Sequence, residues 1–480
     1  MIQKKKKFYI TTTLPYVNSD PHIGFALEII QADVIARFKR QQGFEVFFNT
    51  GTDEHGLKIF KKAQENNMDP RAYCNMYAAK FNNLKEVLDL SYGNFVRTTD
   101  SHHIKAAQEF WLRCQNNGDI YKKNYKIKYC VGCELEKTDS ELQDEKCSIH
   151  PNLNIEIIEE ENYFFKYSKY QKKLLDFYKK NLEFVVPRSK LNEIMEFTKK
   201  GLEDFSISRL QEKMPWGVPV PNDQKHVMYV WFDALVSYIS ALGWPEDQKK
   251  FKEFWPGMQS AGKDNLRQQS SMWQAMLMSA GLPNSKQIFI HGFVTANGQK
   301  MSKSLGNVVD PFELVERYGT DAVRYYLLRE FSPTEDGDFS MGKFAQRHNA
   351  DLAGGIGNLL ARTVTLARKP DFKEKKPIPK IKKEAERIKK EYVKYLEAFK
   401  FNEALAIVWE LISFCDKYIN EQKPWENKEN ASQVISDVLF ALDEIADMLE
   451  PCLPETSEKI KKAVKNKTTE ILFPRVDSSL

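Results

Sequence analysis

The sequence lacks any apolar segment long enough to cross a membrane. Its longest apolar stretch, Val227–Leu242, is interrupted by Asp233 and falls short of the roughly 20 apolar residues that span a bilayer. The basic run Lys4–Lys7 is not followed by the apolar segment that a signal peptide requires. We therefore predict a cytoplasmic protein that has no membrane partner.

Cysteine is scarce, and the net charge is small. The chain has 480 residues, 7 cysteines and a net charge of +5. The cysteine count is odd and three of them cluster at Cys130, Cys133 and Cys147, which opposes a disulfide framework and favours a metal site. The weakly basic charge permits nucleic-acid binding without requiring it. The length is too great for a single core, so we expect about two to four domains.

A nucleotide site is predicted near the N-terminus, although the chain has no P-loop. Residues 8–14 are expected to form a buried strand, 24–41 a helix and 45–49 a second strand, which make a βαβ unit. The first loop then lies at the carboxyl edge, where parallel sheets bind ligands. Gly24 allows a ligand to approach closely, and His22 can donate a hydrogen bond to a phosphate. The alternative is a turn histidine that binds no ligand.

A second short run, Lys-Met-Ser-Lys-Ser at Lys300–Ser304, follows a turn signal at Asn297–Gln299. Two lysines three residues apart, with hydroxyl residues between them, suit a flexible clamp on a triphosphate. The alternative is a solvated surface loop, but this run is far more specific than its charge. We predict that Lys300 and Lys303 complete the ATP site on the side opposite His22.

Two acidic residues follow other predicted elements. Asp53, within Gly51–Gly56, lies after the second strand, where its carboxylate suits a substrate ammonium group. Asp264, in Gly262-Lys263-Asp264, precedes the strand expected at 287–293 and suits ribose hydroxyls or a metal. For both residues the alternative is a helix N-cap, and for Asp264 that alternative is equally good.

The cysteine cluster has the spacing of a zinc knuckle. The pattern is Cys130-x2-Cys133-x13-Cys147-x2-His150, in which two chelating turns are brought together. Four protein ligands leave no open position, so we expect one structural Zn²⁺ ion. The alternative is three buried thiols and a surface histidine.

These motifs, in this order and spacing, resemble those of the methionyl-tRNA synthetases, a family of class I aminoacyl-tRNA synthetases, over nearly the whole chain. The motifs that carry the resemblance are Pro15-Tyr16-Val17-Asn18-x-x-Pro21-His22-Ile23-Gly24, Gly51-Thr52-Asp53-Glu54-His55-Gly56, the zinc knuckle, Tyr229-Val230-Trp231-Phe232-Asp233-Ala234, Gly262-Lys263-Asp264, and Lys300 to Ser304. The first motif, the placement of the knuckle and the Trp231 segment point to the methionine branch.

The resemblance implies an α/β fold in which a class I Rossmann catalytic domain is split by a zinc-knuckle connective insertion and followed by an all-α anticodon-binding helix bundle. The expected boundaries are 1–114 and 224–299 for the two halves of the catalytic domain, 115–223 for the insertion, 300–350 for the lysine loop and a stem-contact segment, and 351–480 for the bundle. Helical periodicity at 311–318, 401–418 and 434–449 agrees with this arrangement. The chain stops at Leu480 without the C-terminal oligonucleotide-binding module of some relatives, which predicts a monomer.

The resemblance also implies the reaction and its residues. The expected partners are ATP with Mg²⁺, L-methionine and tRNA(Met), and the expected catalytic residues are His22, Lys300 and Lys303. The implied ATP-binding residues are His22, Gly24, Asp264, Lys300, Ser302 and Lys303. The implied methionine-binding residues are Leu14, Tyr16, Asp53, Trp231, Ala234, Tyr238 and Gln269. The implied readers of the CAU anticodon are Asn358, Arg362 and Trp425, which on their own would be read as a solvated pair and a core tryptophan.

Three residues depart from the family pattern. Phe25 replaces the histidine that usually ends the first motif, Asn265 replaces an apolar pocket residue, and Gln269 replaces a histidine near the substrate sulfur. The last two changes leave open a class I synthetase for another amino acid. The first leaves open an inactive, zinc-containing tRNA-binding protein. We expect no separate editing domain, because no insertion is large enough.

Overall fold

The catalytic half is built around a six-stranded parallel sheet. The computed structural model describes residues 5–133, 135–137, 141–301, 306–468 and 471–477. The strand order is β3 (Asn94–Arg97), β2 (Glu45–Thr52), β1 (Lys7–Thr12), β14 (Met258–Gly262), β15 (Gln287–His291) and β9 (Val185–Val186), and every adjacent pair is parallel. Helices cover the sheet, which explains why its central strands β1, β14 and β15 are buried almost throughout.

The first βαβ unit confirms the sequence prediction. β1, α1 (Ile23–Gln41) and β2 lie within a few residues of the expected 8–14, 24–41 and 45–49. α1 is buried along most of its length and packs against the sheet. The helices that follow β2, before the antiparallel region, are α2 (Leu57–Glu65), α3 (Pro70–Val87) and α4 (Ser101–Asn116). The carboxyl ends of β1, β2, β14 and β15 lie at one edge, which is where parallel sheets bind ligands.

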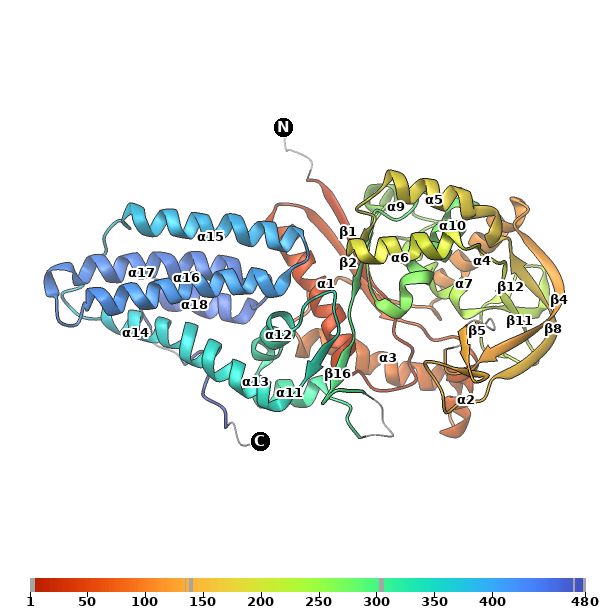
Figure 1. Ribbon diagram of the computed structural model, residues 1–480, viewed down its shortest axis with the longest axis horizontal. Coiled ribbons are helices and arrows are strands. Elements are labelled where there is room, and N and C mark those ends of the chain that lie inside the picture. The colour runs from red at the N-terminus through yellow and green to blue at the C-terminus, as the bar shows by residue number, and fades with distance from the viewer. Residues whose placement is uncertain (1–4, 134, 138–140, 302–305, 469–470, 478–480) are drawn as a thin grey trace.

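Most strands in the region between α4 and β14 pair antiparallel with one another. Its long hairpin, β4 (Ile120–Cys130) with β8 (Glu156–Phe165), lies at the end of the molecule far from the helical half (Figure 1). One strand from this region, β9, nevertheless joins the parallel sheet beside β15. The remaining elements of the region are β5 (Leu135–Lys137), β6 (Leu142–Gln143), β7 (Lys146–Cys147), α5 (Gln171–Lys180), α6 (Arg188–Lys199), β10 (Phe205–Ser206), β11 (Ser208–Leu210), β12 (Pro219–Val220), β13 (Asp223–Met228), α7 (Val230–Ala234), α8 (Ser237–Ser240) and α9 (Gln248–Phe254).

A connecting segment follows β15 and leads to a helical bundle. The connecting segment contains α11 (Pro311–Tyr318), which confirms the helix expected at 311–318. Its other elements are β16 (Val294–Ala296), β17 (Gln299–Lys300), α12 (Thr320–Arg329), β18 (Gly337–Phe339) and α13 (Met341–Arg347). The catalytic half also contains α10 (Trp273–Ser279), between β14 and β15. The bundle consists of α14 (Asn358–Ala367), α15 (Pro379–Glu397), α16 (Phe401–Gln422), α17 (Lys428–Leu449) and α18 (Pro454–Asn466).

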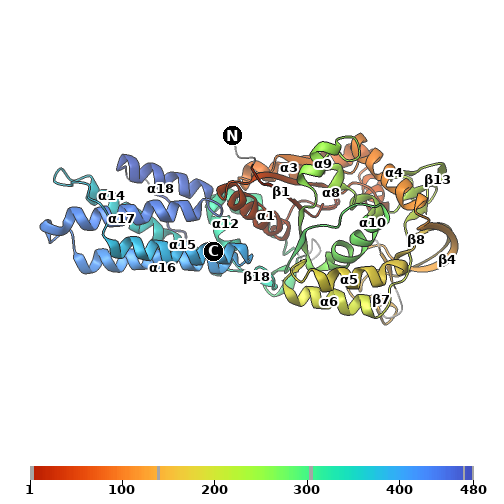
Figure 2. The ribbon, with the colours of Figure 1, turned by 90° about the horizontal axis from the view of Figure 1, so that it is seen from above.

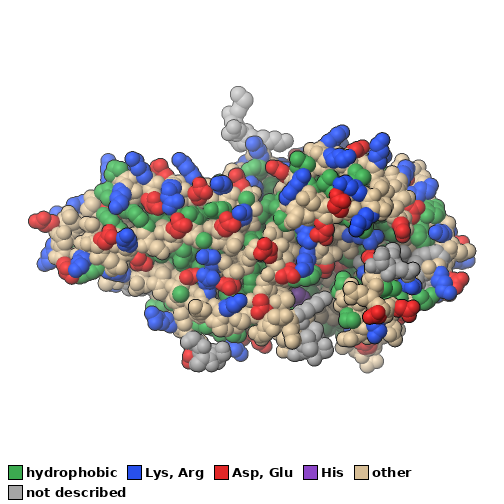
Figure 3. Space-filling view, in the orientation of Figure 1, with side chains coloured by type: hydrophobic (Ala, Val, Ile, Leu, Met, Phe, Trp, Pro, Cys, Tyr) green, Lys and Arg blue, Asp and Glu red, His purple; other side chains and the backbone are tan. Residues whose placement is uncertain are grey.

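The two halves form an elongated molecule with the bundle at one end (Figures 1 and 2). On the face shown in Figure 3, Lys and Arg side chains are interspersed with Asp and Glu side chains over both halves, in keeping with the small net charge. Among the described helices, none is both long enough and apolar enough to span a bilayer.

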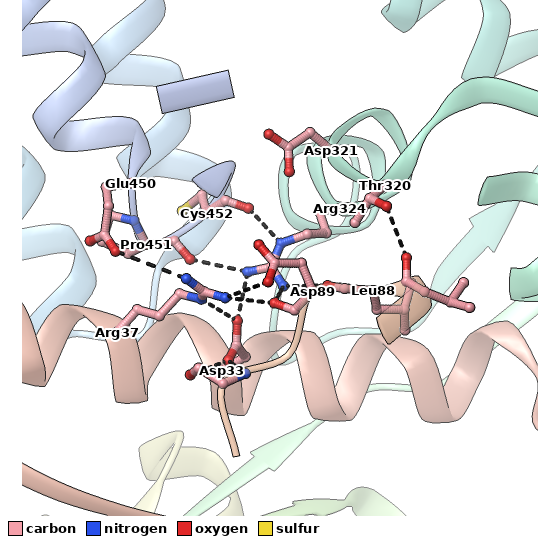
Figure 4. Close-up of polar contacts among 12 residues, drawn as sticks. Asp33, Arg37, Leu88, Asp89, Thr320, Asp321, Arg324, Glu450, Pro451 and Cys452 are labelled. Carbon is pink, nitrogen blue, oxygen red and sulfur yellow. Dashed lines mark hydrogen bonds and ion pairs between the residues drawn. The ribbon is translucent and has the colours of Figure 1, made fainter. Parts of the chain in front are cut away.

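A buried ion pair joins the halves (Figure 4). The guanidinium of Arg324, on α12, donates to the Asp33 carboxylate on α1 at 2.8 Å. The same guanidinium donates to the backbone carbonyls of Leu88 at 2.9 Å and Cys452 at 2.8 Å. Burial acts to raise the pKa of Asp33, but Arg324 and Arg37 outweigh it and hold that pKa below its ordinary value. One side chain therefore ties α1, the turn after α3 and the α17–α18 turn together.

Removing this guanidinium should destabilise the protein strongly. Arg324→Met removes one of the two guanidiniums paired with the buried Asp33 carboxylate and also the donor to the Leu88 and Cys452 carbonyls, so we expect a loss of about 3 kcal/mol of unfolding free energy. Urea unfolding followed by circular dichroism measures the change. As a control, Arg387→Met removes an ion-paired guanidinium that is 48% exposed, and the loss should stay within about 1 kcal/mol. Equal losses for the two variants would contradict the assignment.

Candidate functional site

The two motifs predicted to bind ATP lie side by side. α1 begins directly after His22, whose Nδ1 accepts a hydrogen bond from the Gly24 backbone N–H at 3.1 Å. The Ile23 backbone N–H donates to the carbonyl of Val309, which follows the lysine run, at 3.1 Å. A Cβ atom on Gly24 would lie 3.7 Å from Met301 Cε. The first turn of α1 and the segment around the lysine run are therefore in contact.

The lysine run itself is only partly described. Lys300 ends β17, and its backbone pairs with Thr295 on β16. Met301 packs against the hydrophobic core beside Gly24. Ser302 and Lys303 lie outside the described residues. Their assignment as parts of the ATP clamp therefore stays a prediction.

The protonation state of His22 follows from its surroundings. Burial lowers the pKa of His22 below its ordinary value, so the imidazole is neutral at pH 7. A neutral imidazole carries one proton, and Nδ1 is occupied as the acceptor of the Gly24 N–H. Nε2 therefore carries the proton and is the atom that can donate to a ligand at the start of α1.

Phe25 points its ring into a hydrophobic contact. The ring packs edge-to-face against Phe81 of α3, with 5.3 Å between the ring centroids. The departure from the family pattern thus replaces a polar imidazole by an aromatic ring that joins the core next to the helix start.

A buried polar pair that the sequence analysis missed lies at the same sheet edge. Glu28, on α1, accepts hydrogen bonds from the backbone N–H of Thr13 at 2.7 Å and from its hydroxyl at 2.6 Å. Its other oxygen lies 2.9 Å from Nε2 of His291, the last residue of β15. Burial acts to lower the pKa of His291, but the Glu28 carboxylate outweighs it and raises that pKa. A glutamate among the apolar residues of a buried helix was the signal that could have revealed Glu28.

The residues after β1 and β2 that are predicted to bind methionine lie together. Tyr16 and Asp53 form an isolated parallel bridge. The Asp53 backbone N–H donates to the Pro15 carbonyl at 3.0 Å, and the Val17 N–H donates to the Asp53 carbonyl at 3.3 Å. The loop that begins with Leu14 therefore lies against the residue that follows β2, and the Asp53 side chain is buried there.

The other residues predicted to bind methionine lie in two short helices and a π-helical segment. Trp231 and Ala234 belong to α7, and Tyr238 belongs to α8. Gln269 lies in a π-helical segment, Gln268–Met272, a type of distortion that is common at functional sites. Its Nε2 donates to the Tyr238 hydroxyl at 2.6 Å, and its Oε1 accepts from Gln259 Nε2 at 3.1 Å. Gln269 thus fixes the Tyr238 ring through a buried network.

Asp264, predicted to bind ATP, and Asn265, a departure from the family pattern, lie just after β14. Asp264 follows Gly262 directly after the strand and is exposed. Asn265 donates from Nδ2 to the Asp264 carboxylate at 3.1 Å. A Cβ atom on Gly262 would lie 3.6 Å from His291 Cε1, so Gly262 brings the end of β14 close to the Glu28–His291 pair.

The four predicted metal ligands converge. The ligand atoms of Cys130, Cys133, Cys147 and His150 all lie within 4.8 Å of one another. The Cys133 sulfur is 3.4 Å from the Cys147 sulfur and 3.2 Å from His150 Nδ1. Ligands of a tetrahedral Zn²⁺ ion, at about 2.0–2.3 Å from the metal, lie about 3.3–3.8 Å apart. A Cβ atom on Gly132 would lie 2.6 Å from the His150 ring, so glycine is required there. The cluster therefore has the dimensions of a four-ligand metal site.

The three predicted anticodon residues gather on the bundle. The Arg362 guanidinium lies over the Trp425 ring, 4.4 Å from its centroid, and Trp425 is 38% exposed. Arg362 also donates to Asn420 Oδ1 on α16 at 2.7 Å. Asn358 is exposed one helical turn before Arg362, directly after a π-helical segment, His348–Gly357. Asn420 is a member of this group that the sequence analysis did not single out.

Comparison with known proteins defines the class. A family model described as tRNA synthetases class I (M) matches residues 8–143 and 132–364. A second model, described as the anticodon-binding domain of tRNA ligase, matches residues 380–478. The parallel sheet with paired nucleotide motifs at its edge, followed by a helical bundle, is thus that of a class I tRNA synthetase.

Individual relatives narrow the class to one family. The chain is 43% identical over 475 residues to a methionine–tRNA ligase of Thermotoga maritima, covering 95% of this chain and 75% of the relative. It is 44% identical over 472 residues to that of Thermosynechococcus vestitus, covering 94% and 89%. A structure of Mycobacterium tuberculosis methionyl-tRNA synthetase with methionyl-adenylate superimposes with a TM-score of 0.90 at 34% identity, covering 98% of this chain and 99% of that one. The chain belongs to the methionyl-tRNA synthetase family.

The position of the His22 imidazole can be tested through Gly24. In Gly24→Ala the new Cβ would lie 2.9 Å from His22 Cε1, so the ring must move. Loss of one aligned donor costs about 100-fold in turnover, and we expect kcat of methionine-dependent ATP–pyrophosphate exchange to fall by that factor. The matched control is Gly342→Ala, where a Cβ meets nothing within 4 Å, and its kcat should not change. A normal kcat for Gly24→Ala would show that the ring position does not matter.

Proposed function

We propose that the protein activates L-methionine with ATP and then transfers the methionyl group to the 3′ end of tRNA(Met). The observation that carries this proposal is the contact of the His22–Gly24 turn with Met301 and Val309, on either side of the lysine run, at the sheet edge where Asp53 also lies. A nucleotide held between the two motifs would present its α-phosphorus towards an amino acid held at Asp53.

In the first step, an oxygen of the methionine carboxylate attacks the α-phosphorus of ATP. The bond from that phosphorus to the bridging oxygen breaks, and methionyl-adenylate and pyrophosphate form. His22 donates from Nε2 to the phosphate oxygens as their negative charge grows, and Lys300 and Lys303 bind the leaving pyrophosphate. Mg²⁺ bound to ATP adds positive charge at the phosphates, and Asp264 holds the ribose. No covalent bond to the enzyme forms, so catalysis is positioning and electrostatics.

The pocket is proposed to suit an apolar side chain despite Gln269. The Asp53 carboxylate binds the methionine ammonium group, and the side chain lies among Leu14, Tyr16, Trp231, Ala234 and Tyr238. The carbonyl of Gln269 and one of its N–H groups already bond to Gln259 and Tyr238. Asn265 bonds outward to Asp264. These internal bonds favour methionine over the alternative of a polar amino acid.

In the second step, the 2′-hydroxyl of the terminal tRNA adenosine attacks the adenylate carbonyl, and AMP leaves. The bundle holds the other end of the tRNA. Trp425 offers an exposed ring for base stacking, and Arg362 and Asn358 offer hydrogen-bond donors to an unpaired base. We propose that these three residues read the CAU anticodon.

The proposed function predicts which substrates react. Pyrophosphate exchange measured against each of the twenty amino acids should be fastest with L-methionine, and [¹⁴C]methionine should be transferred to tRNA with a CAU anticodon. The same tRNA with a changed anticodon base should be charged at least about 5-fold less efficiently, because a lost hydrogen-bonded contact to a base edge costs roughly 1–3 kcal/mol. A faster reaction with another amino acid would support the alternative specificity, and tRNA binding without any exchange would support the inactive-protein alternative.

We propose that the cysteine cluster holds one structural Zn²⁺ ion. Metal analysis of the purified protein should find one equivalent, and Cys147→Ser should lower the zinc content and loosen the hairpin around the cluster, because three ligands hold Zn²⁺ more weakly than four. Cys114→Ser, a change of a buried thiol outside the cluster, should keep the metal. Full zinc content in Cys147→Ser would remove Cys147 from the ligand set.

A further inference from the structure

A buried carboxylate lies between two imidazoles behind the proposed methionine pocket. Asp233 Oδ2 is 2.6 Å from His55 Nδ1, and Asp233 Oδ1 is 2.7 Å from His103 Nε2. All three side chains are buried. They come from α7, from the loop after β2 and from α4, and the proposed reaction uses none of them.

The charge of this cluster follows from its contacts. Burial acts to raise the pKa of Asp233, but the imidazoles of His55 and His103 outweigh it and lower that pKa to about 2. The carboxylate is therefore ionised at neutral pH, and an ionised carboxylate accepts hydrogen bonds only. His55 must donate from Nδ1 and His103 must donate from Nε2. Without both donors a buried charge would be left unpaired at high cost.

Asp233 and His55 are close in sequence to proposed pocket residues, and His103 contacts the helix that carries another. Asp233 is adjacent to Ala234 and two residues after Trp231, and His55 is two residues after Asp53. The chain of contacts continues from His103 Nδ1 to the Ser240 hydroxyl at 2.9 Å, on the short helix α8 that carries Tyr238.

We infer that Asp233 is a positioning residue for methionine, which acts by fixing Asp53 and the side-chain wall relative to each other. This inference rests on the proposed function. The wall consists of two very short helices, α7 and α8, which have little rigidity of their own. The hydrogen bond from His55 holds α7 against the loop after β2, and the hydrogen bonds of His103 hold α7 and α8 against α4. A misplacement of about 1 Å in such a site can cost about 100-fold in rate, so the cluster controls recognition without touching the substrate.

Asp119 provides a matched control elsewhere in the chain. Its carboxylate is also buried, and it accepts hydrogen bonds from Tyr170, Ser279 and Lys169 at 2.5, 2.7 and 2.5 Å. None of these partners is a proposed pocket residue. Asp119→Asn therefore reports the general effect of neutralising a buried, hydrogen-bonded carboxylate.

The first test separates the two substrates in pyrophosphate exchange. Asp233→Asn should raise KM for methionine by at least about 10-fold, while KM for ATP changes by less than about twofold, because none of the cluster's hydrogen bonds described above reaches His22. Asp119→Asn should change neither value. Equal rises in both KM values, or no rise for methionine, would overturn the inference. A wild-type protein that shows no methionine-dependent exchange would instead refute the proposed function.

The second test uses the geometry of the two imidazoles and does not depend on Asp233→Asn folding. Gln places an N–H near the position of histidine Nε2, and Asn places one near Nδ1. His103→Gln and His55→Asn should therefore keep KM for methionine near the wild-type value, whereas His103→Asn and His55→Gln should raise it. Thermal unfolding of all four variants shows whether each is folded. If both substitutions at a position have the same effect, the hydrogen bond to Asp233 does not position the pocket.

Discussion

The buried contact between the Asp33 carboxylate and the Arg324 guanidinium fixes helix α1, and the proposed ATP site depends on where that helix begins. α1 carries His22 at its start, Glu28 one and a half turns later and Asp33 beyond that. Glu28 holds Thr13 and His291 at the sheet edge, and Asp33 holds the segment that leads to the bundle. A shift of α1 would therefore move the phosphate-binding turn, the sheet edge and the bundle contact together.

Two polar groups in and beside the proposed substrate site, Gln269 and Asp233, have hydrogen-bond partners before any substrate arrives. Gln269 bonds to Tyr238 and Gln259, and the Asp233 carboxylate accepts from two imidazoles. Such groups do not have to reorient during the reaction, which is the physical basis of electrostatic preorganisation. The same bonds would let a glutamine line the proposed methionine pocket.

Much of this arrangement could be predicted from the sequence, because it rests on local signals. The first βαβ unit has clear periodicity, and the cysteine spacing specifies a cluster whose ligand atoms do converge. β14 was not predicted, because Met-Gln-Ser-Ala-Gly contains no β-branched residue and its buried polar groups resemble a loop. β9 was not predicted either, since two valines inside an insertion carry no sign of joining a distant parallel sheet.

The polar pairs of the site could not be predicted from the sequence, for a different reason. Glu28 and His291 are separated by 263 residues, and His55 and Asp233 by 178. Only the folded sheet brings such residues to one edge, and no periodicity records the pairing. The proposed roles of Lys300 and Lys303 rest on the motif alone.

The central claim is that one edge of the parallel sheet holds both substrates between the His22 turn and the lysine run. A crystal structure of this protein with L-methionine and a non-hydrolysable ATP analogue tests it most directly. We predict phosphate oxygens about 3 Å from His22 Nε2, with the methionine ammonium group bound to the Asp53 carboxylate. A nucleotide bound away from His22, or an ammonium group bound to another residue, would contradict the account.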